Sequence, residues 1–213
     1  AEYRFLGPLS VHRNVVEEND FALPEKPFVY ISLGTVFNRD EKLLKAVIEQ
    51  FGAEDRPARE SGAVRDSRNS GKWDYQVVLV RSPQAGEKPV VYPDNFIVKP
   101  FVNQNEILAR ASLFISAGGM NSIHEALYYG VPCLLCPQQG EQLLNAKRFE
   151  KLGFGRILRG TDTLRQEAEE CMKLKNLWDE EKRRQMLRVS VRRTIAMFRE
   201  FQESDFDVRD VDT

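Results

Sequence analysis

Short apolar runs alternate with longer stretches of helical periodicity along most of the chain. Several of the short runs are almost continuously apolar, which is typical of strands covered on both faces. The expected strands are residues 28–33, 75–80, 96–98, 113–116, 132–136 and 155–158. Alternation of this kind predicts βαβ units and therefore a parallel sheet.

Helical periodicity fills the intervals between the expected strands. The expected helices are residues 41–51, 105–110, 122–129, 141–152, 162–175 and a longer charged helix at 177–201. Right-handed crossovers would wind these elements into a single open sheet. The predicted fold class is therefore α/β, a Rossmann-like open parallel sheet of about six strands with helices on both faces.

Three segments fall outside the alternation. Residues 1–25 begin with Ala1 rather than methionine and form a Pro-containing extension. We expect this extension to be a linker from a preceding domain, and the chain to be a fragment. Residues 52–72 are polar, with mixed charge, and predict a surface insertion. Residues 203–213 form an acidic tail, which leaves residues 26–202 as the main domain.

Composition narrows the function classes. The 213 residues are 42% hydrophobic, which suits one substantial core. The 31 basic and 32 acidic residues nearly cancel, so nucleic acid is not an expected partner. No apolar run approaches the roughly 20 residues of a membrane span, and no signal peptide is visible. Three cysteines argue against a disulfide framework, so we expect a reducing compartment and a cytoplasmic protein.

The loop after the first expected strand combines a small residue with a hydroxyl. Gly34 and Thr35 follow that strand directly. In an open parallel sheet, ligands bind beyond the carboxyl ends of the strands. Gly34 would let the backbone approach a ligand and Thr35 would offer a donor, although a plain turn explains the glycine equally well.

The loop after the expected strand 113–116 has the features of an anion site. Gly118 and Gly119 permit close backbone approach just before a helix begins. A helix N-terminus presents free N–H groups and partial positive charge, which suits a phosphate. Asn121 and Ser122 would either cap this helix or donate to a diphosphate.

Acidic and amide side chains complete this edge of the sheet. Glu125, one turn into the helix, could accept hydrogen bonds from vicinal ribose hydroxyls. Alternatively, it could simply be an acid that is stabilised by the positive end of the helix. Glu141 and Gln142 follow the expected strand 132–136, and such side chains bridge the hydroxyls of a sugar. A capped helix start is the competing explanation for Glu141.

These loops in this order resemble the C-terminal, donor-binding half of the GT-B glycosyltransferases that use UDP- or dTDP-sugars, especially the macrolide-type bacterial enzymes. The matching stretches are FVYISLGT (28–35), FVNQNEIL (101–108), FISAGGMNSIHEALYYGVP (114–132) and QQGEQLLNAKR (138–148). The resemblance implies one half of a GT-B fold and a nucleotide-sugar site. The positions it implies for that site are Thr35, Phe101, Val102, Gln104, Gly118, Gly119, Asn121, Ser122, Glu125, Glu141 and Gln142.

The resemblance also implies a role for each group. Phe101 would stack on the base in place of the usual Trp, and the Val102 backbone would bond the base edge. Gln104 and Glu125 would bind the ribose, and the loop with Gly119 would bind the pyrophosphate with help from Thr35. Glu141 and Gln142 would then hold the sugar hydroxyls.

Ala117 departs from the pattern, because the family usually has His there. That His offers a hydrogen bond to the diphosphate, and losing such a bond costs about 1.5–3 kcal/mol, or about one to two decades in affinity or rate. One possibility that follows is a non-catalytic nucleotide-sugar sensor or scaffold. An oxidoreductase with a dinucleotide-binding domain is a further alternative, but the turn after the first strand lacks G-x-G-x-x-G.

The implied activity is that of an inverting glycosyltransferase of hexosyltransferase type, which moves a sugar to an acceptor hydroxyl. The family's general base lies in the other domain, and His12 is the sole histidine before the first strand. We therefore expect no catalytic residue in this chain and a need for an acceptor domain or partner subunit. No metal and no cofactor besides the donor sugar nucleotide are expected. His124 and the Cys133–Cys136 pair, on opposite faces of a strand, are predicted to be structural.

Overall fold

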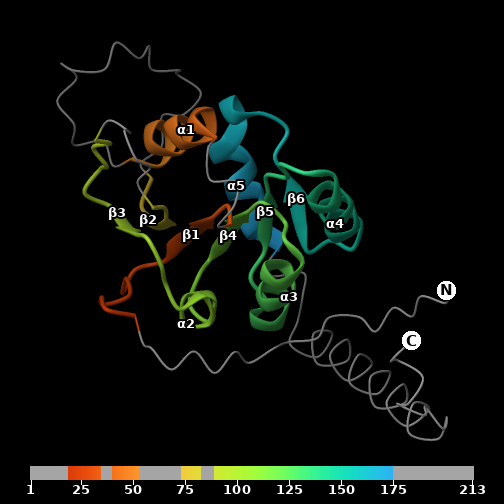
Figure 1. Cartoon of the computed structure of the whole chain (residues 1–213), viewed down its shortest axis with the longest axis horizontal. Helices are drawn as coiled ribbons and strands as arrows, with labels where there is room; N and C mark the ends of the chain where they lie inside the picture. The colour runs from red at the N-terminus through yellow and green to blue at the C-terminus, as the bar shows by residue number, and fades with distance from the viewer. Residues whose placement is uncertain (1–18, 35–39, 53–72, 83–88, 175–213) are drawn as a thin grey trace, which may run out of the picture.

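The computed structural model describes residues 19–34, 40–52, 73–82 and 89–174, and its core is a six-stranded parallel sheet (Figure 1). The strands run in the order β3-β2-β1-β4-β5-β6. Their bounds are β1 (Phe28–Ser32), β2 (Gln76–Val80), β3 (Phe96–Lys99), β4 (Leu113–Ser116), β5 (Cys133–Leu135) and β6 (Gly155–Ile157). The predicted fold class, a Rossmann-like open parallel sheet, is confirmed.

Five α-helices and one 3-10 turn are described. They are α1 (Glu41–Phe51), α2 (Gln104–Leu108), α3 (Met120–Tyr129), α4 (Gly140–Lys151), η2 (Thr161–Thr163) and α5 (Leu164–Met172). The expected helix at 162–175 is wrong in its first turn, which is the 3-10 turn η2. The expected helix at 177–201, the tail at 203–213 and, apart from Gly52, the insertion at 52–72 lie outside the described residues.

Alternation along the strands divides the core into two layers. In β1, Phe28 and Tyr30 belong to one buried cluster, and Val29 and Ile31 belong to the other. Residues of α2, α3 and α4 cover the first face, and residues of α1 and α5 cover the second, as the two sides of the sheet in Figure 1 show. All strands are parallel, so their carboxyl ends share one edge.

The order of the strands reverses direction between β1 and β4, and the loops at the carboxyl edge of the sheet follow this reversal. From β1 the chain winds outward through β2 to β3, and it then returns to β4 on the other side of β1. The connections that leave β1 and β4 therefore run in opposite directions along the sheet, and in open parallel sheets ligands bind at such a switch point. The loop after β4 and the start of α3 lie at this point.

Part of the predicted N-terminal linker packs against this domain. The Asn19 side chain donates to Glu106 Oε2 at 2.8 Å and accepts from the Asn103 N–H at 2.8 Å. Arg110 donates to the Pro24 carbonyl at 2.8 Å, and Lys99 lies 2.9 Å from the Asp20 carboxylate. These contacts fix residues 19–24 along α2, so this stretch helps to hold α2 in place.

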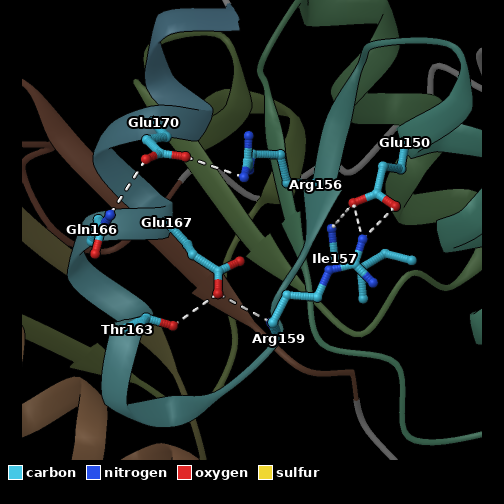
Figure 2. Close-up of polar contacts among 8 residues, drawn as sticks. All are labelled: Glu150, Arg156, Ile157, Arg159, Thr163, Gln166, Glu167 and Glu170. Carbon is cyan, nitrogen blue, oxygen red and sulfur yellow. Dashed lines mark hydrogen bonds and ion pairs between the residues drawn. The ribbon is translucent and has the colours of Figure 1, made fainter.

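Two carboxylates close the outer edge of the sheet at β6 (Figure 2). The Ile157 N–H donates to Glu150 Oε1 at 2.9 Å, and the Arg159 N–H donates to Glu167 Oε1 at 3.2 Å. Between them, Leu158 donates to the Leu135 carbonyl of β5. Unpaired N–H groups on an edge strand invite pairing with another chain, so Glu150 and Glu167 protect this edge.

The three cysteines are free and buried. Cys133 lies in the cluster under α3 and α4, whereas Cys136 lies in the cluster under α1 and α5. The prediction that this pair faces opposite sides of the sheet is confirmed. Burial raises the pKa of the Cys136 thiol to about 12, and also raises that of Cys171 to about 12. These thiols are therefore protonated core residues rather than metal ligands or nucleophiles.

Candidate functional site

The loop between β4 and α3 is fixed from two sides. Gly118 has a φ of +84°, a conformation that favours glycine, and its N–H donates to Ser116 Oγ at 3.3 Å. Asn145 Nδ2, from α4, donates to the Gly118 carbonyl at 3.2 Å. A Cβ on Gly118 would lie 3.3 Å from the Gln142 carbonyl, so the turn packs closely on α4. The two glycines therefore belong to a rigid turn.

No described residue covers the N-terminus of α3. Gly119 is its N-cap residue, with no side-chain capping bond, and a Cβ on Gly119 would meet no atom of the described residues within 4 Å. Asn121 and Ser122 lie inside the first turn, so the alternative in which they cap this helix is wrong. The N–H groups of Met120, Asn121 and Ser122 have no acceptor within the helix, as at any helix start. This geometry suits an anion.

Behind this turn lies a buried carboxylate. Glu125 is 6% exposed, and Gln104 Nε2 donates to its Oε2 at 2.5 Å. The same amide nitrogen lies 3.5 Å from Ser122 Oγ, and Gln104 Oε1 accepts from Tyr30 Oη at 3.0 Å. The structure therefore brings together three predicted site residues, Gln104, Ser122 and Glu125, and adds Tyr30 to them.

Phe101 stands out because it is a large aromatic residue on the surface. It is 69% exposed, whereas the next residue, Val102, is 8% exposed. Both precede α2, whose N-cap residue Asn103 accepts from the Glu106 N–H. An exposed aromatic ring beside a fixed helix start offers a flat surface for stacking, and the buried Val102 anchors the backbone that carries it.

The loop between β5 and α4 is tied together by an amide. Gln142 Oε1 accepts from the Gln138 N–H at 2.8 Å, which fixes the Gln142 side chain. Gln138 Nε2 is buried, and among the described residues it has no hydrogen-bond partner. Glu141 is exposed in the first turn of α4, and Gln139 is the N-cap residue, so Glu141 does not cap this helix. Polar donors and an acid therefore gather at this strand end.

Three further residues that the sequence singled out have distinct outcomes. Thr35 lies outside the described residues. Ala117 is 3% exposed, so a larger side chain there must displace its neighbours. His124 is half-buried, and burial lowers its pKa, so it is neutral near pH 7.

Sequence reasoning missed Tyr30 and Asn145. Tyr30 reads as one more apolar residue of a buried strand, and its partner Gln104 is 74 positions away in the chain. Asn145 follows Gln142 by three positions on α4, so the two share a helix face. That spacing was a signal that the Gln142 face of α4 carries a second amide toward the site.

The described residues contain no group of three or more His, Cys, Asp or Glu side chains that could hold a metal ion. Within the same residues, no helix is both long and apolar enough to span a membrane. The polar groups at the carboxyl edge are thus amides, hydroxyls, carboxylates and backbone N–H groups, which suit an anionic ligand that also bears hydroxyls.

Residues 45–193 match the family model described as the glycosyltransferase family 28 C-terminal domain. The NDP-glycosyltransferase YjiC of Bacillus subtilis is 36% identical over 152 residues, covering 71% of this chain and 34% of that protein. Its namesake in Bacillus licheniformis is 35% identical over 163 residues, covering 76% of this chain and 37% of that protein. The chain therefore spans only about a third of the length of these relatives.

Solved structures share the fold at lower identity. The glycotransferase of kitacinnamycin has a TM-score of 0.66 and 22% identity, covering 89% of this chain and 45% of that chain. The calicheamicin glycosyltransferase has a TM-score of 0.58 and 22% identity, covering 80% of this chain and 40% of that chain. In both comparisons the described fold corresponds to less than half of a larger protein.

Proposed function

The chain belongs to the glycosyltransferase family 28 C-terminal domain family, and on that premise we propose that it is the donor-binding half of an inverting glycosyltransferase that uses a UDP- or dTDP-sugar. The observation that carries the proposal is the buried Glu125 carboxylate behind the uncapped start of α3. A carboxylate and a helix N-terminus side by side suit a nucleoside diphosphate, because one accepts from ribose hydroxyls while the other attracts phosphate.

In this proposal each part of the donor has its own contact. The diphosphate lies against the N–H groups that begin α3, where Gly119 leaves open space. The ribose hydroxyls donate to Glu125, and the base stacks on the exposed ring of Phe101. The transferred sugar lies toward Glu141, Gln142 and the buried Nε2 of Gln138, which has no hydrogen-bond partner among the described residues.

The donor half would contribute binding and charge stabilisation rather than proton transfer. When an acceptor hydroxyl displaces the sugar, negative charge develops on the departing diphosphate, and the start of α3 stabilises it. The general base that deprotonates the acceptor would come from a second domain or a partner subunit. Relatives about three times as long as the matched segment are consistent with such a second half.

Isothermal titration calorimetry with UDP, dTDP and uridine tests the proposal. We expect saturable binding of at least one diphosphate, and affinity for uridine at least about tenfold weaker than for UDP, because uridine lacks the charge that α3 attracts. Absence of binding to either diphosphate at millimolar concentration would contradict it, as would equal affinities for UDP and uridine. Robust sugar transfer by the isolated chain would contradict the need for a second half.

Ala117 favours a second candidate function, a nucleotide-sugar sensor or scaffold without turnover. Restoring the family residue through Ala117→His is expected to strengthen UDP binding about tenfold, since one charge-directed hydrogen bond is regained. Ala117→Leu is the matched control, because it adds bulk without an N–H donor at this buried position. Equal UDP affinities in the His and Leu variants, with equal melting temperatures, would show that Ala117 is not the defect.

A further inference from the structure

A chain of hydrogen bonds leads from the core of the sheet to the Glu125 carboxylate. Tyr30 Oη donates to Gln104 Oε1 at 3.0 Å, and Gln104 Nε2 donates to Glu125 Oε2 at 2.5 Å. Tyr30 comes from the sheet strand β1, whereas Gln104 and Glu125 come from α2 and α3, which are drawn below the sheet in Figure 1. Tyr30 is therefore two hydrogen bonds away from the Glu125 carboxylate.

The chemistry of the groups fixes the direction of these bonds. A carboxylate only accepts, so the amide of Gln104 must present its NH₂ to Glu125. Its carbonyl oxygen then points the other way and needs a donor. The Tyr30 hydroxyl is the donor that the structure provides. The carboxylate therefore sets which way the amide faces, and the phenol stabilises that orientation by donating to the amide oxygen.

Tyr30 is held rigidly enough to act in this way. It is 1% exposed, and its ring stacks on Phe114 of the neighbouring strand with centroids 4.7 Å apart and planes 9° from parallel. Burial raises the pKa of the Tyr30 phenol well above its usual value, and the negative charge of Glu125 raises it further, despite an opposing hydrogen bond with Ser32. The hydroxyl therefore keeps its proton, and with it its donor role, at every pH at which the protein would be assayed.

We propose that Tyr30 is a positioning residue for the ribose: through Gln104 it holds Glu125 in the rotamer that receives the ribose hydroxyls. This inference rests on the proposed function, because it concerns the same nucleotide site. It assigns to Gln104 a second task besides contact with the nucleotide, and it assigns a task to a core residue that touches no ligand.

The test compares Tyr30→Phe with the unchanged chain, using UDP and 2′,3′-dideoxyuridine diphosphate as probes in calorimetry. The unchanged chain is expected to prefer UDP by about tenfold or more, because the dideoxy compound offers no hydroxyl to Glu125. Tyr30→Phe keeps the ring stacked on Phe114 but removes the donor. We expect it to weaken UDP binding by about three- to tenfold and to leave the affinity for the dideoxy compound unchanged.

A merely structural role for Tyr30 predicts a different pattern. Loosened packing would weaken the binding of both probes equally and leave the ratio of the two affinities unchanged. That result would overturn the inference. In a Glu125→Ala background, Tyr30→Phe is expected to have no further effect on UDP affinity, since the carboxylate it positions is gone. Tyr75→Phe serves as the matched control, because Tyr75 packs on Trp73 on the opposite face of the sheet, and it is expected to leave both affinities unchanged.

Each remaining outcome separates this inference from the proposed function. If the unchanged chain binds UDP but shows no preference over the dideoxy compound, diphosphate binding stands, whereas the ribose contact of Glu125 and the positioning role of Tyr30 are both wrong. If the unchanged chain binds neither compound nor dTDP, the proposed function fails and the inference fails with it. If Tyr30→Phe reduces the preference for UDP over the dideoxy compound and the control variant does not, the role of Tyr30 is supported.

Discussion

Replacement of Gly119 by Asp is expected to abolish UDP binding without lowering the melting temperature of the chain. Gly119 is the N-cap residue of α3, and a Cβ there would meet no described residue within 4 Å. Asp is among the best N-cap residues, and its charge also complements the helix dipole. The variant should therefore melt at the same temperature or about 1–3 °C higher.

The same carboxylate would occupy the place proposed for the diphosphate. Two unit charges 4 Å apart repel by about 1 kcal/mol in water and about 4 kcal/mol near a protein surface, and the side chain also fills space. Together these effects predict UDP binding at least about 100-fold weaker. A variant that gains stability and loses binding would separate ligand contact from folding, because a damaged fold would lose both.

Gly119→Asn is the matched control for charge. Asn has nearly the same shape as Asp and caps a helix equally well, so the two variants differ chiefly in one negative charge. We expect Asn to weaken UDP binding by much less than Asp, and the gap between them to narrow as salt is added. If the Asp and Asn variants bind UDP equally in low salt, the diphosphate does not lie at the start of α3.

The strands and most helices could be predicted because burial on both faces leaves a direct mark in the sequence. The runs that became β1 and β4 are apolar at nearly every position, and alternate residues belong to different clusters. Asp40 marks the start of α1 by accepting from the Leu43 N–H at 2.9 Å. These are local effects, and local effects are visible in a single sequence.

Predictions failed where the choice between two local solutions depended on distant contacts. Asn121 and Ser122 are good capping residues, yet α3 begins before them at Met120. The turn that decides this is held by Asn145 from α4 through the Gly118 carbonyl. A single sequence does not show that contact, because it joins positions 27 apart.

The candidate site illustrates the same division. The residue types at each strand end were visible, since loops at the carboxyl edge of a parallel sheet are adjacent in any such fold. Their connections were not visible, because Tyr30 joins Gln104 through the interior. A tyrosine in an apolar strand gives no sign of whether its hydroxyl has a partner. The partner of Tyr30 comes from the packing of α2 against the sheet.

Gly155→Ala is expected to be the most destabilising small substitution in the described sheet. Gly155 begins β6 opposite Cys133 of β5, and a Cβ there would lie 2.2 Å from the Cys133 carbonyl oxygen. Backbone cannot swing aside as a side chain can, so β6 would have to move away from β5. That movement would strain the hydrogen bond from the Cys133 N–H to the Phe154 carbonyl oxygen, whose N–O distance in the unchanged chain is 3.2 Å.

We expect Gly155→Ala to lower the free energy of unfolding by about 3 kcal/mol, as forced overpacking does. Gly160→Ala is the control, because a Cβ there meets nothing within 4 Å and its φ of −164° suits any residue. It should leave stability unchanged or raise it by about 0.4–1 kcal/mol through the unfolded chain. Urea unfolding followed by circular dichroism measures both variants. Equal unfolding midpoints for Gly155→Ala and Gly160→Ala would mean that β6 can move away from β5 at little cost. The contacts of Glu150 and Glu167 would then not hold this edge of the sheet tightly.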